Sequence, residues 1–296
     1  MALVVALAAC QKEQEQMDVV VGGEVDMIVN VNAPSSTRAG SEKGIFESGI
    51  LDSVATMRYI LQVFYIDENN ATHKTEPQIK YDDNSIVAFN VRLTPNRDYT
   101  FVVWADVVDS IGAGDKHYIT EDLTNIRVNS DSWRAMDETR DAFTATLPVI
   151  DFTGSSIINL NLLRPNAKLR VKATDITATT TMPSLATVTY TTKHRTAFNA
   201  YTGKPAEASA SEVDHEYVID NIYNESDTER TLFSDYFFAS EDGEKVTFEI
   251  ELKKGNDTMK SLEFSDISIK RNHLTTIEGN MLSSGNVDNT SSVTEN

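Results

Sequence analysis

The residue with the most distinctive chemistry is the single cysteine, Cys10, which ends a short apolar run and precedes a polar stretch. Residues 2–9 are all apolar or small, as in the hydrophobic part of an export signal. Small residues followed by a cysteine form the pattern at which bacteria cleave a lipoprotein precursor and acylate the thiol. We therefore expect Cys10 to carry lipid, because acyl chains anchor a protein with about 0.8 kcal/mol for each buried methylene.

The alternative for Cys10 is a buried cysteine in a hydrophobic core. Lipidation is the better interpretation, because the run stands at the start of the sequence and no second thiol exists to form a disulfide. No Lys or Arg precedes Ala2, and a start upstream of Met1 would supply the basic residues that normally come before such a run. We expect the polar residues 11–16 to form a solvated tether.

A second candidate for chemistry is Arg38, which lies in a small, polar, proline-marked stretch over residues 33–40. Exposed connections of this composition are preferred sites of proteolysis. A cut between Arg38 and Ala39 would release the lipid-bearing segment together with the alternating stretch Glu24–Val31. The alternative is an ordinary solvated arginine in a loop, which composition alone favours.

No set of residues in the sequence has the pattern of a catalytic or metal site. Gly112–Asp115 lacks the third glycine of a dinucleotide-binding turn and the Gly-Lys-Ser/Thr ending of a phosphate loop, and the chain has no Gly-x-Ser-x-Gly motif. We interpret Asp67–Asn70 as a hairpin turn and the carboxylate pairs Asp82–Asp83 and Glu241–Asp242 as solvated turns. The histidines do not have zinc-site spacing: His73, His117, His194, His215 and His273. We therefore expect no enzymatic activity, no metal and no cofactor.

Charge and length restrict the partners and the number of domains. The chain has 296 residues and a formal charge of −19, which repels phosphate backbones and argues against nucleic-acid binding. The hydrophobic fraction of 40% is enough for a sizeable core, and the length fits about two domains.

The elements that must position these residues are strands. Glu24–Val31 alternates between apolar and polar residues, whereas Arg58–Ile66 is an almost continuous apolar run, as in a strand buried on both faces. Most of the segments are short and bounded by turn-forming residues, so we predict all-β sandwich domains with short helices in loops. The other predicted strands are Ser85–Leu93, Tyr99–Trp104, Ser156–Leu163, Ala167–Ala173, Ala186–Thr191, Lys245–Leu252 and Leu262–Ile269.

The best domain boundary falls at Arg164-Pro165, where one series of strands ends and another begins. A long irregular segment, Val107–Ala142, interrupts the first series, and short helices are expected near Ile45–Val54 and Ser130–Asp137. The predicted organisation is a signal and tether at 1–23, an N-terminal sandwich at 24–163 that includes a propeptide at 24–38, a C-terminal sandwich at 164–282 and a flexible polar tail at 283–296.

Three stretches carry a resemblance to a known family: YTFVVWAD (Tyr99–Asp106), LLRPNAKLRVKATD (Leu162–Asp175) and IKRNHLTTIEGNML (Ile269–Leu282). They resemble the fimbrillin-like lipoproteins of the type V pilin superfamily, over most of residues 24–282. The resemblance implies two tandem transthyretin-like Greek-key sandwiches, export to the outer membrane as a lipoprotein and a place in a surface fimbria.

The resemblance also implies a mechanism and partners. An arginine-specific protease would remove the N-terminal segment, and a strand from another pilin subunit would fill the groove that opens. The outer membrane, through the lipid on Cys10, and a host or bacterial surface ligand are the other expected partners. The C-terminal stretch Asn286–Asn296 lacks the alternating apolar residues of a good donor strand, so the segment around Leu274–Leu282 is the alternative donor.

Five residues of the resembling stretches are expected to be structural. We predict that Trp104 buries its ring near the end of a strand and that Asp106 bonds the turn that follows. Arg164 is expected to fix the domain junction, and Arg271 and Asn272 to close the last regular strand region through hydrogen bonds. A different class of function stays open, namely a surface lipoprotein that binds a glycan or a host protein and never polymerises.

Overall fold

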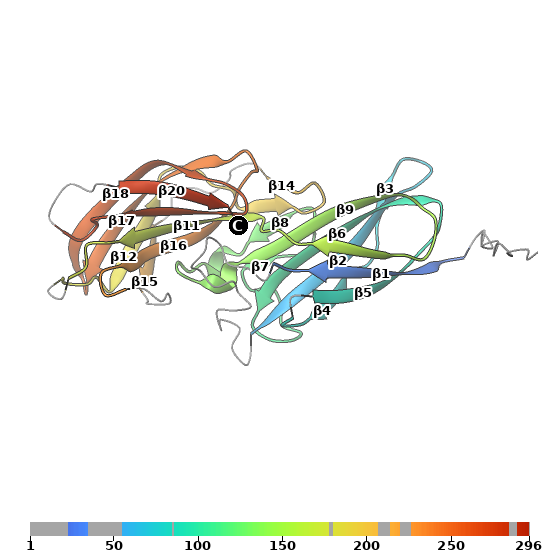
Figure 1. Ribbon diagram of the computed structural model, residues 1–296, viewed down its shortest axis with the longest axis horizontal. Coiled ribbons are helices and arrows are strands. Elements are labelled where there is room, and N and C mark those ends of the chain that lie inside the picture. The colour runs from blue at the N-terminus through green and yellow to red at the C-terminus, as the bar shows by residue number, and fades with distance from the viewer. Residues whose placement is uncertain are drawn as a thin grey trace, which may run out of the picture.

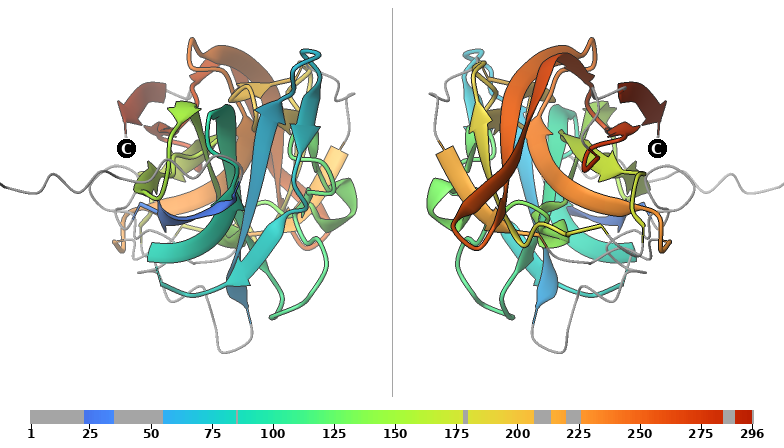
Figure 2. Two further views of the ribbon diagram at one scale, coloured as in Figure 1. Left: turned by 90° about the vertical axis from the view of Figure 1, so that its right-hand side faces the viewer. Right: turned by 90° about the vertical axis from the view of Figure 1, so that its left-hand side faces the viewer.

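The computed structural model describes residues 23–34, 55–84, 86–177, 180–206, 214–219, 226–283 and 289–295. These residues form two β-sandwiches that lie end to end along the long axis of the molecule (Figure 1). Views along that axis show curved sheets packed face to face (Figure 2). The prediction of all-β sandwich domains is therefore confirmed.

The N-terminal sandwich packs a three-stranded sheet, in the order β10-β1-β5, against a sheet in the order β3-β2-β6-β9, with β4 also paired to β2. Its core contains apolar residues from both sheets, among them Leu61, Phe89 and Phe101. The strands are β1 (Val25–Asn32), β2 (Thr56–Ile66), β3 (Thr72–Lys74), β4 (Gln78–Tyr81), β5 (Ile86–Leu93), β6 (Arg97–Val108), β9 (Ala142–Phe152) and β10 (Ile157–Asn161).

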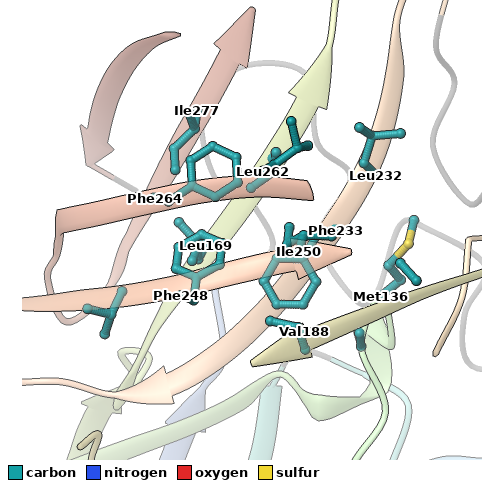
Figure 3. Packing of buried hydrophobic residues seen from close by; sticks show 14 of the residues in the cluster. Met136, Leu169, Val188, Leu232, Phe233, Phe248, Ile250, Leu262, Phe264 and Ile277 are labelled. Carbon is teal, nitrogen blue, oxygen red and sulfur yellow. The ribbon is translucent and has the colours of Figure 1, made fainter. Parts of the chain in front are cut away.

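The C-terminal sandwich packs the sheet β16-β11-β19-β20 against the sheet β15-β12-β17-β18. Leu169, Phe233, Phe248 and Phe264 come from both sheets and point into the space between them (Figure 3). The strands are β11 (Asn166–Ala173), β12 (Leu185–Tyr190), β15 (Asp214–Val218), β16 (Arg230–Phe238), β17 (Glu244–Lys254), β18 (Asp257–Ile269), β19 (His273–Gly279) and β20 (Asn289–Glu295).

A small third sheet, in the order β14-β13-β8-β7, lies between the sandwiches. It joins β7 (Tyr118–Ile119) and β8 (Ile126–Val128), which follow β6 of the first sandwich, to β13 (Ala197–Asn199) and β14 (Lys204–Pro205) of the second half. A separate apolar cluster lies at this sheet, so the junction has a core of its own.

Every predicted strand is present, with ends that differ by a few residues. Three long strands within residues 24–282 were not predicted. β9 contains Pro148, which an edge strand tolerates because one side of its backbone forms no ladder bonds. β16 contains Ser234 and Asp235 in its interior, although its four aromatic residues were an available signal. β19 was recognised only as part of the resembling stretch around His273.

Two expectations about irregular segments need correction. The stretch expected to be a flexible tail contains β20, which pairs antiparallel with β19, because ladder bonds use backbone groups and do not require an apolar sequence. The irregular segment Val107–Ala142 contains β7, β8 and two 3₁₀ turns, η1 (Ser130–Ser132) and η2 (Glu138–Arg140). The first turn lies within the helix predicted at Ser130–Asp137, and the helix predicted at Ile45–Val54 lies outside the described residues.

Candidate functional site

The first strand, β1, occupies the middle of its sheet. It pairs antiparallel with β5 over its whole length and parallel with β10 from Ile28 to Asn32. β10 lies 129 residues later in the chain, so the first and last strands of the N-terminal sandwich are neighbours in this sheet. A strand between two partners forms ladder bonds on both sides, and its removal would leave two unpaired edges.

The inward face of β1 is part of the hydrophobic core. Met27, Val29 and Val31 are 1%, 0% and 0% exposed and pack within the cluster that fills the N-terminal sandwich. Their spacing of two residues is the alternation recognised in the sequence, and it places all three side chains on one face. Removal of β1 would therefore open a groove with an apolar floor.

The outward face of β1 matches β10 residue for residue. The Asn30 amide donates to the Asn159 side-chain oxygen at 3.1 Å, and the Asn32 amide donates to the Asn161 oxygen at 3.2 Å. The register pairs identical residue types: Ile28 with Ile157, Asn30 with Asn159 and Asn32 with Asn161. Side-chain amides that bond across a parallel pair fix its register, which backbone bonds alone leave open to slippage.

The other edge of β5 is covered by side chains from β4. Lys80 Nζ donates to the Ala88 carbonyl at 2.6 Å, and Gln78 Nε2 donates to the Asn90 carbonyl at 3.1 Å. A lysine at a strand edge discourages pairing with another chain. The outer edge of β5 is therefore a poor place for another strand to pair.

The structure brings three of the predicted structural residues together. Asn272 Oδ1 accepts from the Arg164 backbone N–H at 3.4 Å, and Arg271 Nε donates to the Arg164 carbonyl at 3.3 Å. Arg164 is 2% exposed, and its Nε donates to both carboxylate oxygens of Asp141. These contacts join the chain between β10 and β11 to the turn before β19. Arg271 and Asn272 thus come before a strand, whereas we expected them to close the last one.

Arg271 also reaches the small sheet at the junction. Its Nη1 donates to the Gly203 carbonyl at 2.7 Å and lies 3.2 Å from Glu241 Oε1. Burial lowers the pKa of Arg271, and the charge of Glu241 opposes that change. The guanidinium carbon lies 5.3 Å from the centre of the Phe198 ring, a cation–π distance. Arg271 is therefore a contact point between three separate segments.

Trp104 and Asp106 lie on β6 and are 0% and 1% exposed. The Trp104 ring packs edge-on against Tyr118 at 5.2 Å between ring centroids, within the apolar cluster of the junction. Asp106 does not bond the following turn as we expected. It accepts two hydrogen bonds from Arg58 of β2, at 2.9 and 2.7 Å, and Arg58 in turn binds Asp115 of the following loop. Burial raises the pKa of Asp106, and the ion pair opposes that rise.

The sequence did not reveal the buried ion pair of the junction. Arg140 of η2 pairs with Asp235 of β16, and their side chains are 4% and 2% exposed. Asp235 also accepts from Tyr190 Oη and from Trp133 Nε1. Burial acts to lower the pKa of Arg140, but Asp235 together with the neighbouring tyrosines Tyr118 and Tyr190 raises it by more, so the pKa of Arg140 is raised. The segment 130–141 of the first half is thereby fastened to the second sandwich.

Two of the segments that we set aside as sites, those around Asp67 and Asp115, have structural roles. Asp67 accepts from the backbone of Asn69 and Ala71, as in a turn between strands. Asp115, at the end of the glycine-containing loop, accepts from Thr120 as well as from Arg58. No group of three His, Cys, Asp or Glu side chains in the described part of the chain could hold a metal ion.

Three predicted sites, Cys10, Arg38 and Ala39, lie outside the described residues. β1 ends at Asn32, six residues before Arg38 in the sequence. Over the described ranges, the structure contains no helix of the length and apolarity required to cross a membrane.

Comparison with solved structures shows the same fold at low sequence identity. A candidate cell adhesion protein from Bacteroides ovatus matches with a TM-score of 0.50 and 13% identity, over 92% of this chain and 98% of its own. One from Bacteroides eggerthii matches with a TM-score of 0.50 and 12% identity, over 94% and 98%. One from Parabacteroides distasonis matches with a TM-score of 0.50 and 12% identity, over 92% and 97%.

None of the curated proteins matches the sequence. The sequence profile of a family of unknown function, DUF6562, matches residues 16–295, which includes every strand from β1 to β20. The chain therefore belongs to the DUF6562 family.

Proposed function

We propose that this protein is a structural or accessory subunit of a bacterial surface fimbria. In this proposal it is exported as a lipoprotein precursor, anchored through Cys10 and assembled by exchange of its first strand after cleavage at Arg38. The observation that carries the proposal is that β1 is central in its sheet and buried on alternate residues, and stands directly before a candidate cleavage stretch.

Burial makes spontaneous loss of β1 unfavourable. Met27, Val29 and Val31 are each at most 1% exposed, and full burial of one such side chain contributes about 1.5–3 kcal/mol. A cut at Arg38 removes the covalent link but none of these contacts. Release of β1 is therefore expected only when another strand takes its place, which is β-augmentation by a second copy of the chain.

β20 is the better candidate for the donated strand. It pairs only with β19 among the described strands, whereas β19 lies between β11 and β20 and would break two ladders on leaving. Its sequence has a single large apolar residue, Val293, so most of its affinity would come from backbone bonds. The alternative donor around Leu274–Leu282 overlaps the buried strand β19.

The structural neighbours support a role at the cell surface. Three proteins with this fold, each over more than nine-tenths of this chain, are described as candidate cell adhesion proteins. At 12–13% sequence identity, these similarities show the fold alone. The proposal of fimbrial assembly therefore rests on the sequence resemblance and on the position of β1.

The test treats the purified precursor with an arginine-specific protease and follows the products by mass spectrometry and by electrophoresis without boiling. We expect a fragment that starts at Ala39 and a ladder of oligomers. Arg38→Lys keeps the charge but removes the cleavage site, so it should give neither. Arg127→Lys, at an exposed position of β8 away from β1, is the matched control and should behave as the wild type. A cleaved protein that stays monomeric would contradict the proposal and favour a surface lipoprotein that does not polymerise.

A further inference from the structure

A cavity of about 670 Å³ lies where the two sandwiches and the small sheet meet. It is lined by β9 and the end of β10, by the β13–β14 turn, by the β16–β17 turn and by Arg271. The volume is within the range of small-molecule sites, which occur preferentially between domains. Neither the assembly proposal nor the core packing gives this cavity a role.

The cavity wall carries both signs of charge side by side. Arg195, Lys204 and Arg271 are the cations, and Glu241 and Asp242 are the carboxylates. Attraction by one sign is largely offset by repulsion from the other, so the wall favours neither a phosphate-like anion nor a cation strongly. A ligand with many hydroxyl groups suits such a wall, because each hydroxyl both donates and accepts a hydrogen bond.

Two of these charged side chains are available to a ligand. Lys204 and Asp242 are exposed, and neither side chain has a hydrogen-bond or ion-pair partner within the described ranges. The other charges are already engaged: Arg195 Nε contacts both oxygens of Glu244 at 2.7 Å, and Arg271 is held by Gly203 and Glu241. In this wall, other residues hold Arg195 and Arg271 in place, whereas Lys204 can donate a hydrogen bond to a ligand and Asp242 can accept one.

An aromatic ring completes the wall. Tyr201 is half-buried and lines the cavity, and its ring centroid lies 4.9 Å from that of Phe64, which supports it from β2. The turn that carries Tyr201 is fixed in place, since Asn199 Oδ1 accepts from the Thr202 N–H at 2.9 Å and Gly203 adopts a φ of +67°. A ring held in this way offers an apolar face to the C–H side of a sugar.

We propose that this cavity binds a neutral saccharide, with its ring against Tyr201 and its hydroxyl groups between Lys204 and Asp242. The site consists of side chains from both sandwiches, so it exists only while they are docked as they are here. It does not depend on strand exchange, because the uncleaved chain contains all of its residues. The saccharide proposal and the assembly proposal can therefore fail independently of each other.

The test uses the uncleaved protein and saturation-transfer NMR. The probes are cellobiose, lactose, mannobiose and chitobiose, with digalacturonate, trialanine and inorganic phosphate as competitors of other chemistry. We expect transfer to at least one neutral disaccharide, and no displacement of it by trialanine or phosphate. No transfer to any of the four disaccharides, or displacement by trialanine or phosphate, would overturn the proposal.

Two substitutions locate the site. Lys204→Ala and Asp242→Asn each remove one charged hydrogen-bond partner, and each should weaken binding roughly tenfold or more. Lys245→Ala and Asp257→Asn are matched controls at exposed positions outside the cavity, and should bind as the wild type. All four positions are exposed, so the fold is retained, and equal unfolding midpoints check this. Unchanged binding in both cavity variants would overturn the proposal, as would digalacturonate binding that depends on Lys204 but not on Asp242.

Discussion

Val29→Ala tests the role of β1 in the N-terminal sandwich. Val29 is 0% exposed and lies opposite Phe89 of β5 and Ile158 of β10. The substitution removes two methyl groups, and a loss of about 0.8 kcal/mol for each gives about 1.6 kcal/mol. The cavity left behind adds to this, so we expect the free energy of unfolding to fall by about 2–3 kcal/mol.

The assay is a urea titration followed by tryptophan fluorescence, with Asp26→Ala as the control on the same strand. The Asp26 side chain is 84% exposed, and its substitution should leave the midpoint unchanged. In protein cleaved after Arg38, Val29→Ala should also speed release of the N-terminal fragment, by roughly 30-fold if 2 kcal/mol of binding is lost. Equal midpoints for Val29→Ala and the wild type would refute the reasoning, because β1 would then contribute nothing to the core.

Three further predictions concern the junction. Asp235→Asn leaves the buried Arg140 charge without its partner and should lower the free energy of unfolding by about 3–5 kcal/mol. Arg140→Met added to Asp235→Asn removes the unpaired charge and keeps an acceptor for Tyr190 and Trp133, so it should recover much of that loss in thermal denaturation. Burial lowers the pKa of His117 from 6.5 to about 4, so the unfolded chain binds the proton more tightly, and stability should fall by as much as roughly 3 kcal/mol as the pH drops from 6.5 to 4. His117→Gln should flatten that part of the stability profile, and an unchanged slope would contradict the assignment. Asn272 has a φ of +59°, so Asn272→Val should cost about 1–2 kcal/mol from backbone strain. Asn272→Gly loses the side-chain contact with Arg164 but not the backbone conformation, so it should cost less than Asn272→Val in the same denaturation assay.

The strands with clear local patterns were predictable from the sequence. β1 and β5 alternate between apolar and polar residues, because each has one face on the core and one on solvent. β2 has a continuous apolar run because the sandwich core covers one of its faces and the junction cluster covers the other. The turn around Asn96 was also predictable, and Asn96 has the positive φ of 60° that such turns require.

The junction could not be predicted, because its contacts join residues far apart in the sequence. Asp235 lies among the buried residues of β16, and only the approach of Arg140, 95 residues earlier, makes its burial favourable. Glu241–Asp242 has the composition of a solvated turn, and nothing local shows that it lines a cavity together with Lys204. Arg164, by contrast, was predicted at the junction, because a basic residue before Pro165 stood between two series of strands.

The central claim is that β1 is exchanged for a strand of another copy after cleavage at Arg38. Native mass spectrometry of the cleaved and assembled protein tests this most directly, because it weighs each oligomer together with every strand that it retains. We expect oligomers built from the fragment that starts at Ala39, with no N-terminal fragment in any subunit whose groove is occupied by a neighbour. Oligomers in which every subunit keeps its own N-terminal fragment would contradict this claim.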